Sequence, residues 1–271
     1  MPQIGETMKL IITAPKGKMG SLNTLIAAER DDIEIVGGIG PKGRPYIGTD
    51  LGQAAGIGKD LGVKVYDNLE DIIDQCDCVL DFSTVEMGMS ILEICKKHGK
   101  ALVCGTTGFS PEQRQAFADA GKDIPVMLAA NTSRMVNVMS KLLEMAASAL
   151  HETCDIEILD MHDNKKLDAP SGTAKELAET ICEASGMSFE DVEYGHAGRG
   201  VRNKGNVVYH SMRGGDTPSS HIVYFMGTGE RLEIAHHSIN WKCFASGAVD
   251  ACEWIVKQPK GSYVISDAVQ L

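Results

Sequence analysis

The chain has 271 residues, and 26 Lys and Arg side chains against 37 Asp and Glu side chains give it a formal net charge of −11. Such a protein has no overall positive field for nucleic acid or an anionic membrane, and aromatic residues, at 5 %, are too few to favour stacking on bases. The 29 glycines against 9 prolines indicate either flexible linkers or many turns where the backbone approaches a ligand closely.

Neither an export signal nor a membrane span is expected. The N-terminus lacks a basic stretch followed by a long apolar core, and no apolar run approaches the ~20 residues that a transmembrane helix needs. The 8 cysteines lie in apolar segments without the paired spacing of a zinc site. We therefore expect a cytoplasmic protein with buried, reduced thiols, and a frayed extension over residues 1–7.

The first half of the chain alternates short apolar runs with longer stretches at helical spacing, which is typical of parallel strands joined by helices. The expected fold class is therefore α/β, with a Rossmann-type parallel sheet. Its strands are expected at residues 9–13, 33–39, 63–66, 78–82, 101–104 and 126–130. Its helices are expected around residues 22–29, 69–74, 85–98 and 111–121.

The second half has a different pattern. A helix at 135–150 and a strand at 154–160 precede a helix after Gly172. Three β-rich runs then follow one another without helices between them, at residues 206–213, 219–226 and 230–237, before a last helix at 244–256. Strand after strand predicts an α+β part with a mixed or antiparallel sheet.

A glycine-rich turn at residues 14–20 joins the first strand to the first helix. Such a turn lets backbone N–H groups and the helix dipole meet a pyrophosphate, although Ala14 stands where the dinucleotide-binding pattern has glycine. These glycines are alternatively turn residues only. No acidic residue ends the second strand; Lys42 and Arg44 follow it, which favours a 2′-phosphate and hence NADPH, unless they form a solvated basic loop.

A polar segment at residues 162–173 carries the most chemistry. Ser171, Gly172 and Thr173 offer hydroxyl and N–H groups at a helix start, which suits a carboxylate. His162 exchanges protons near neutral pH, and Lys166 is a nearby cation or acid. Taken singly, Ser171 reads as a helix cap, and the histidine and lysine as ordinary surface residues.

Several motifs in order resemble the dihydrodipicolinate reductase family. After the glycine-rich turn come VCGTTGF at 103–109, AAN at 129–131 and KLDAPSGTA at 166–174. RGGD at 213–216, His221, GERLEI at 229–234 and FASGA at 244–248 follow. The likeness runs from Met8 to the C-terminus, and KLDAPSGTA is its most specific part.

The resemblance implies a dinucleotide-binding domain of residues 8–132 with 244–271, a substrate and oligomerisation domain of residues 133–243, and a homotetramer. It implies that NADPH or NADH reduces a cyclic imine dicarboxylate, 4-hydroxy-tetrahydrodipicolinate, in lysine and diaminopimelate biosynthesis. His162 and Lys166 would handle protons, and Gly172 and Thr173, with Ser171, would hold the substrate carboxylates. Cofactor contacts would fall on Ala14, Pro15, Lys16, Gly17, Lys18, Met19, Gly105, Thr106, Thr107, Ala129, Ala130, Asn131 and Thr132.

Departures from the family pattern gather on the substrate side. Asp163 replaces a second histidine and would repel a dicarboxylate. Thr132 replaces an aromatic residue, and Arg134 adds a guanidinium that could bind a carboxylate in a fork. Trp241 and Lys242 stand where an arginine-bearing segment is typical. Two alternatives follow: a paralogous reductase of another imine or enone carboxylate, or an inactive nucleotide-binding sensor. We expect no metal, because His236 and His237 would point to opposite faces of a strand, away from a common site with His221.

Overall fold

The computed structural model describes residues 7–269, so the expected fraying of residues 1–7 falls outside it except for Thr7. The chain forms two compact units. The first ends at Arg134 and resumes at Trp241, and the second runs from Met135 to Asn240. No helix among residues 7–269 is long and apolar enough to cross a bilayer. No disulfide links the 8 cysteines, all of which lie in this range.

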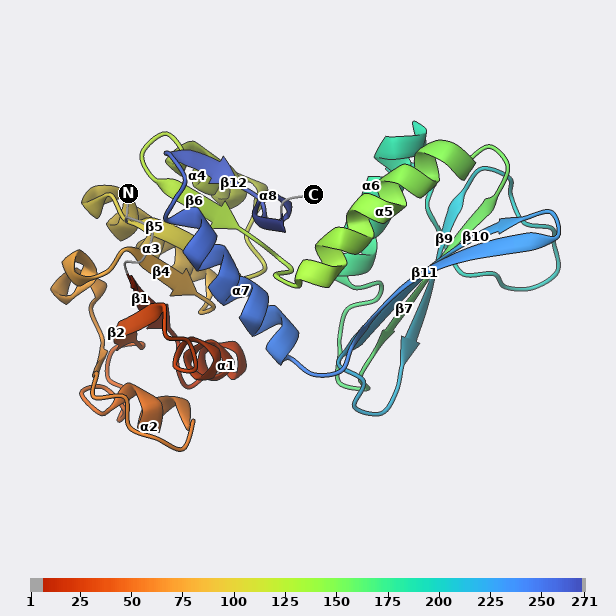
Figure 1. Ribbon diagram of the computed structural model, residues 1–271. Helices are drawn as coiled ribbons and strands as arrows, with labels where there is room; N and C mark the ends of the chain where they lie inside the picture. The colour runs from red at the N-terminus through yellow and green to blue at the C-terminus, as the bar shows by residue number, and fades with distance from the viewer. Residues whose placement is uncertain (1–6, 270–271) are drawn as a thin grey trace. The chain divides into compact units, whose positions relative to one another are not determined.

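The first unit is built on a seven-stranded parallel sheet (Figure 1). In spatial order its strands are β12 (Gly261–Tyr263), β6 (Pro125–Leu128), β5 (Ala101–Cys104), β4 (Cys78–Asp81), β1 (Met8–Thr13), β2 (Ile33–Ile39) and β3 (Val65–Tyr66). Its helices are α1 (Lys18–Ala27), α2 (Leu51–Ala55), α3 (Val85–His98), α4 (Pro111–Ala120), α7 (Lys242–Ile255) and α8 (Ile265–Val269). The Rossmann-type prediction is confirmed.

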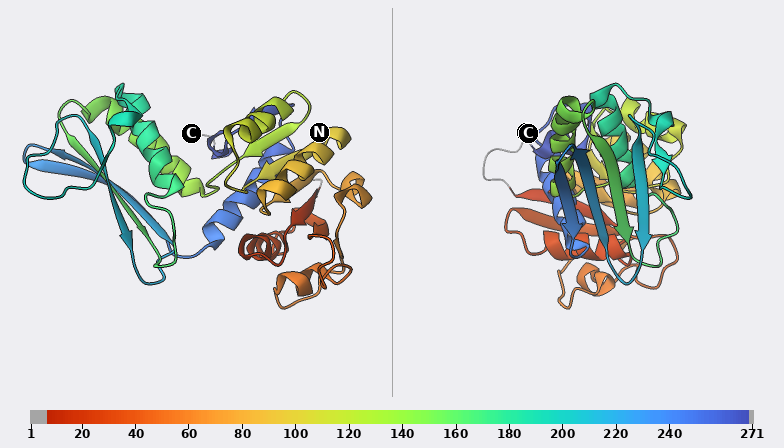
Figure 2. Two further views of the ribbon diagram at one scale, coloured as in Figure 1. Left: turned by 180° about the vertical axis from the view of Figure 1, so that it is seen from behind. Right: turned by 90° about the vertical axis from the view of Figure 1, so that its right-hand side faces the viewer.

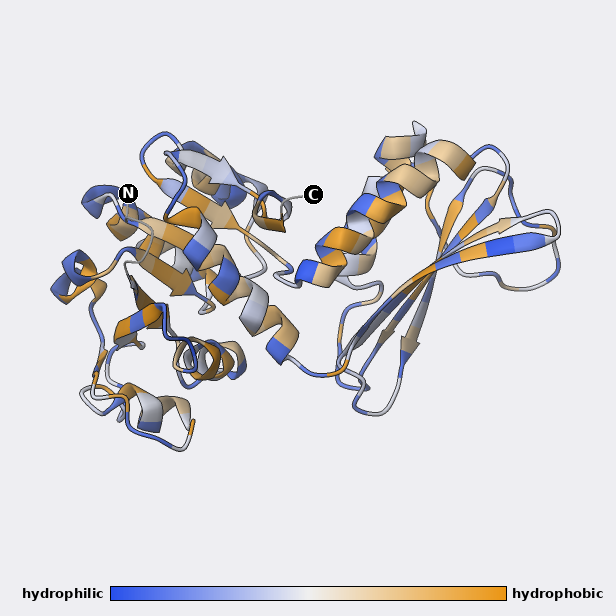
Figure 3. Ribbon diagram, viewed as in Figure 1, coloured by the Kyte–Doolittle hydropathy of each residue, from blue (hydrophilic) through white to orange (hydrophobic). Residues whose placement is uncertain are grey.

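Both faces of this sheet are buried, which explains why its strands are continuously apolar rather than alternating. Leu10 and Ile12 face a core shared with α1 and α7, whereas Ile11 faces a second core shared with α3 and α4. Figure 3 shows these central strands as hydrophobic segments between partly hydrophilic helices. Consecutive side chains of a strand point to opposite sides of the sheet. Because both sides are covered here, every residue of β1 from Leu10 onwards is buried.

Several short elements of the first unit differ from prediction, among them α2, which was not expected. The helix expected at 69–74 is two short 3₁₀ turns, Leu69–Asp71 and Ile73–Gln75, because Ile72 between them has a φ of −134° and interrupts the helix. The C-terminal segment adds strand β12 and helix α8 beyond the expected last helix. Strand β12 is only three residues long, too short for an apolar period to show.

The second unit is a five-stranded mixed sheet with two long helices on one face (Figure 2). The predicted mixed sheet is confirmed, but its short fifth strand at 193–194 was not expected. In spatial order the strands are β11 (Glu230–Ser238), β10 (Ser219–Gly227), β7 (Asp155–His162), β9 (Val207–Arg213) and β8 (Glu193–Tyr194). The helices are α5 (Arg134–Leu150), α6 (Gly172–Ser185) and a 3₁₀ turn at Phe189–Asp191. Strand β7 pairs antiparallel with β10 and parallel with β9, so it lies at the centre.

Strand β7 carries alternate residues toward the helices. Ile156 and Ile158 join the core formed with α5 and α6, so Asp160 and His162, two and four residues further on, lie on the same face. The strand ends at His162, two residues later than predicted. A buried carboxylate and a buried imidazole therefore stand at the end of an apolar strand.

Candidate active site

The glycine-rich turn joins β1 to α1 through a residue with a left-handed backbone. Ala14 adopts a left-handed φ of +48°, the conformation that the family's glycine would take easily. Gly17 is the N-cap of α1, and no side-chain hydrogen bond caps the first turn of this helix. Backbone N–H donors at a helix start bind anions, and this chain presents them between two exposed lysines, Lys16 and Lys18.

Gly20 is required by close contact rather than by its φ angle. A Cβ added there would lie 2.1 Å from the carbonyl oxygen of Ala14. We expect Gly20→Ala to lower the free energy of unfolding by on the order of 3 kcal/mol, because the turn must shift to relieve an overlap with backbone. Chemical denaturation measures this. The control is Gly200→Ala, where a Cβ meets nothing within 4 Å; equal, small effects of the two substitutions would contradict the prediction.

Asp81, at the end of β4, ties three strand ends together. Its carboxylate accepts hydrogen bonds from Thr13 Oγ1 at 2.6 Å and Thr106 Oγ1 at 2.8 Å. Gly105 lies against the ring of Phe82, which a Cβ would overlap at 2.1 Å. Thr106 is buried and its neighbour Thr107 is exposed. The expected cofactor residues at 105–107 thus lie at the carboxyl edge of the sheet, where ligands bind in this fold.

The segment after β6 is held against the start of α7. Thr132, buried, donates its hydroxyl hydrogen bond to the carbonyl of Phe244 at 2.6 Å. A Cβ on Gly247 would lie 1.8 Å from the carbonyl oxygen of Thr132, so the two segments are in backbone contact. Arg134 pairs with Asp250 of α7 at 3.4 Å. Two of the departures from the family pattern, Thr132 and Arg134, therefore contact α7.

The other expected cofactor residues are distributed along the same edge and its loops. Pro15 and Ala129 are buried, and Met19 and Asn131 are partly buried. The Asn131 Oδ1 atom accepts a hydrogen bond from the Ser133 N–H at 2.9 Å. The exposed members are Ala130, after β6, and Lys42 and Arg44 on the loop after β2.

In the second unit, the carboxylate of Asp160 is the centre of a buried polar network. Asp160 is 0 % exposed. Its Oδ1 lies 2.9 Å from His162 Nδ1 and 3.3 Å from His221 Nε2. Its Oδ2 accepts hydrogen bonds from Arg213 Nη2 at 2.9 Å and from the Ser171 N–H at 3.0 Å. Burial alone would raise the pKa of Asp160, but these donors outweigh it and hold that pKa well below its usual range.

Ser171 connects this network to helix α6. Its hydroxyl caps the helix by accepting the Ala174 N–H at 3.1 Å, and it lies 3.0 Å from His221 Nε2. Burial lowers the pKa of His221, although Asp160 acts in the opposite direction. The first helical residues, Gly172 and Thr173, are exposed and partly buried respectively. The site therefore places a helix N-terminus beside a histidine and its carboxylate, as a carboxylate receptor with a proton carrier would require.

Lys166 lies on the loop between His162 and this helix. Its ammonium pairs with Asp168 Oδ1 at 2.8 Å, and the Asp168 carbonyl accepts a hydrogen bond from Arg213 Nη2 at 2.8 Å. Burial would raise the pKa of Asp168, but the hydrogen bond from Lys166 outweighs it and lowers that pKa. The Asp163 carboxylate accepts the Lys165 N–H at 2.8 Å, so this acidic departure stabilises its own turn.

Three residues of the network were missing from the predicted site: Asp160, Arg213 and His221. Arg213 and His221 belong to motifs that carry the resemblance, yet no role was assigned to them. The burial of Asp160 could have been predicted from the sequence, because it follows Ile156 and Ile158 at the spacing of inward-facing positions of one strand. A carboxylate at such a position needs buried partners, and the register of β7 with β9 and β10 supplies them.

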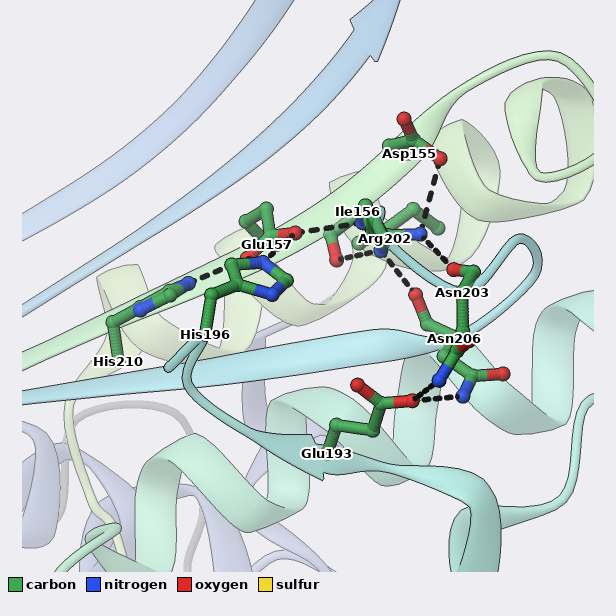
Figure 4. A network of polar contacts seen from close by, with 9 residues as sticks. All are labelled: Asp155, Ile156, Glu157, Glu193, His196, Arg202, Asn203, Asn206 and His210. Atoms are coloured by element: carbon green, nitrogen blue, oxygen red, sulfur yellow. Dashed lines mark hydrogen bonds and ion pairs between the residues drawn. The ribbon is translucent and has the colours of Figure 1, made fainter. Parts of the chain in front are cut away.

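A second histidine cluster lies on the other face of the same sheet (Figure 4). His196 and His210 direct their Nε2 atoms at the Glu157 carboxylate, the former at 3.1 Å, and Arg202 Nε donates to the same carboxylate at 2.8 Å. Burial would raise the pKa of Glu157, but these donors outweigh it and lower that pKa. Arg202 also pairs with Asp155 at 3.0 Å. The cation already beside Glu157 would repel a divalent ion.

Among the described residues, two groups have ligand atoms close enough together for a metal: the Glu157 cluster, and Asp160 with His162 and His221. In each group the carboxylate already pairs with an arginine, Arg202 or Arg213. The absence of a metal cofactor stays a prediction. His236 is buried and His237 exposed, so the expected opposite orientation of the pair is confirmed.

Comparison with known proteins gives a consistent result. Residues 8–132 match the family model for the dihydrodipicolinate reductase N-terminus, and residues 135–269 match that for its C-terminus. Proteins named 4-hydroxy-tetrahydrodipicolinate reductase from Trichlorobacter lovleyi and Geobacter metallireducens are 39 % and 38 % identical over 97 % of this chain and 99 % of theirs.

Solved structures are consistent with these sequence matches. The dipicolinate-bound dihydrodipicolinate reductase from Paenisporosarcina sp. TG-14 has a TM-score of 0.77 and 26 % identity, over 96 % of this chain and 99 % of that one. A scyllo-inositol dehydrogenase from Lactobacillus casei with NAD(H) has a TM-score of 0.61 at 14 % identity, over 98 % of this chain and 94 % of that one, and shares the fold alone.

Proposed function

The chain belongs to the dihydrodipicolinate reductase family, and we propose that it reduces 4-hydroxy-tetrahydrodipicolinate to tetrahydrodipicolinate with NAD(P)H, a step of lysine and diaminopimelate biosynthesis. The observation that carries this proposal beyond family membership is the buried Asp160–His162 pair beside the N-terminus of α6. That arrangement supplies a proton carrier and a carboxylate receptor in one place.

The residues of the glycine-rich turn fit a dinucleotide. Ala14 in a left-handed conformation and Gly20 against its carbonyl make a tight turn that would let the backbone approach a pyrophosphate, and α1 begins there without a side-chain cap. When bound, the cofactor supplies the hydride. Residues 105–107 and 129–132 line the same edge of the parallel sheet and would hold its remaining parts.

The polar residues of the second unit would manage protons and charge. The substrate carries a hydroxyl group that the product lacks, so the reaction consumes a hydride and a proton and releases water. Lys166, an ammonium on the loop, donates that proton and offsets the charge that develops on the substrate. His162, with Nδ1 held by Asp160, presents its other ring nitrogen for proton exchange. The first turn of α6, at Gly172 and Thr173, holds a substrate carboxylate.

Turnover is tested by following NADPH oxidation at 340 nm with freshly generated 4-hydroxy-tetrahydrodipicolinate. Robust turnover supports the proposal. Silence with this substrate and turnover with another cyclic imine would assign the chain to a paralogous reductase, and cofactor binding without any turnover would identify a sensor. The local roles of Asp163 and Thr132 favour the first outcome, because both departures are used in hydrogen bonds within the protein.

Cofactor preference depends on the loop after β2. Lys42 and Arg44 are exposed there, and guanidinium or ammonium groups at this place favour the 2′-phosphate of NADPH. Separate dissociation constants for NADPH and NADH decide the matter. If NADH bound more tightly than NADPH, the assignment of Lys42 to the cofactor site would be wrong.

We place the protein in the cytoplasm as a homotetramer. Cysteines without disulfides are typical of a reducing compartment. The sheet face opposite α5 and α6 carries Met212 and Met226, which are 50 % and 37 % exposed, and such apolar residues suit an interface between copies of the chain. Light scattering should give the mass of four chains; a single-chain mass would contradict this assembly.

A further inference from the structure

Trp241 lies at the point where the chain returns to the first unit, in a segment that typically bears an arginine in the family. It is the N-cap residue of α7, it is partly buried, and its ring centroid lies 5.5 Å from that of Phe244. The Phe244 carbonyl is held by the buried hydroxyl of Thr132. The indole therefore stands on a segment that is fixed by backbone contacts, and it belongs to the same unit as the glycine-rich turn.

The indole contacts a lysine of that turn. Lys18 Nζ lies 4.2 Å from the centroid of the Trp241 ring, within the range of a cation–π interaction. Lys18 is the first residue of α1, and no acidic residue stands in the first turn of this helix. A cation at the positive end of a helix dipole is electrostatically unfavourable, so an anion at this place would relieve it.

An indole holds a cation without neutralising it, and this distinguishes Trp241 from a carboxylate partner. A carboxylate beside Lys18 would cancel its charge and compete with a phosphate, whereas the ring face leaves the ammonium N–H donors and the charge for a ligand. An arginine in place of Trp241 would instead add a second cation beside Lys18.

We propose that Trp241 is a positioning residue for the cofactor, which holds the Lys18 ammonium against the glycine-rich turn so that it meets a phosphate of NAD(P)H. This inference rests on the proposed function, because it needs a dinucleotide at the turn. Its consequence is that Trp241 contributes to cofactor affinity through Lys18 and leaves the proton chemistry of the second unit unchanged.

The test measures NADPH binding by calorimetry in Trp241→Leu, Trp241→Phe, Lys18→Gln and the Trp241→Leu/Lys18→Gln double variant. We expect Trp241→Leu to weaken binding about two- to fivefold, the loss of one cation–π contact. Trp241→Phe should restore most of the affinity, because it keeps a ring face. In the Lys18→Gln background, Trp241→Leu should have no further effect. The Michaelis constant for NADPH should rise in Trp241→Leu while kcat at saturating cofactor stays within twofold.

Trp254→Phe is the matched control. Trp254 lies on the same helix and packs edge-on against Tyr263 at 5.2 Å, and its replacement should leave NADPH affinity unchanged. The inference is overturned if Trp241→Leu binds NADPH as tightly as the unmodified protein. It is also overturned if Trp241→Leu weakens NADPH binding equally with Lys18 present and with Lys18→Gln. In both cases the proposed function stands. Failure of the unmodified protein to bind NADPH or NADH at all overturns the proposed function itself.

Discussion

Lys166→Met is expected to lower kcat by at least about 100-fold, the lower end of what a positioned general acid contributes. Methionine keeps the length and apolar character of the side chain but removes both the ammonium and its pairing with Asp168. His162→Ala should have a comparable effect, because it removes the imidazole that the Asp160 carboxylate holds in place. The rate of NADPH oxidation at saturating substrate measures both.

Lys165→Met is the matched control for this prediction. Lys165 is the neighbouring lysine, it is exposed, and only its backbone N–H bonds to Asp163. We expect this variant to retain kcat within about twofold, because it changes solvated surface charge alone. NADPH affinity should be retained in all three variants, since the glycine-rich turn lies in the other unit. If Lys165→Met and Lys166→Met lost the same activity, net positive charge of the loop would explain the loss and the assigned role would be wrong.

Asp160→Asn is expected to lower the free energy of unfolding by on the order of 3 kcal/mol at neutral pH. It removes a fully buried charge and leaves the Arg213 guanidinium and two imidazoles facing a neutral amide. The same change should lower kcat, because the His162 ring loses the carboxylate that orients it. Urea denaturation and steady-state turnover measure the two effects.

The stability difference has an expected pH dependence. The folded protein holds the pKa of Asp160 well below its usual range, so the stabilisation is fully present above about pH 4, the pKa of an unperturbed aspartate. Below that pH it is lost progressively as the pH falls toward the lowered pKa. The gap between Asp160→Asn and the unmodified protein should therefore narrow in acid.

Asp155→Asn provides the comparison on the same strand. Asp155 pairs with Arg202, but its side chain is 48 % exposed, and such a pair contributes about 0–1 kcal/mol. We expect a small effect with little change in turnover. An Asp160→Asn protein as stable as Asp155→Asn at neutral pH would show that the network around Asp160 contributes no more than a surface ion pair.

Local patterns were sufficient for most of the first unit. Continuous apolar runs and intervening helical spacing located β1, β2, β4, β5 and β6 and predicted a parallel sheet, because strands buried on both faces need no polar residues. Patterns failed where an element was short. Three-residue β12 and the 3₁₀ turns around Ile72 contain too few residues for a period, and pairing with β6 or local φ angles decided them. The strand expected at 63–66 is present as the shorter β3.

For the site, sequence motifs identified the residues that carry the proposed chemistry but not what surrounds them. His162, Lys166 and the start of α6 were predicted because they lie within 12 consecutive positions, residues 162–173. Departures such as Asp163 and Thr132 suggested an altered substrate when taken as isolated letters. Their hydrogen bonds to Lys165 and Phe244 show local structural roles that residue type alone does not reveal.

The sequence by itself determined the fold class, the glycine-rich turn and the family to which the chain belongs, since these depend on local spacing along the backbone. Only the tertiary structure decided that Asp160 pairs with His162, Arg213 and His221, and that the Trp241 ring contacts the Lys18 ammonium. These partners lie up to 223 positions apart, as with Lys18 and Trp241. Strand register and helix packing bring them within hydrogen-bond or cation–π distance, and no local pattern records that register.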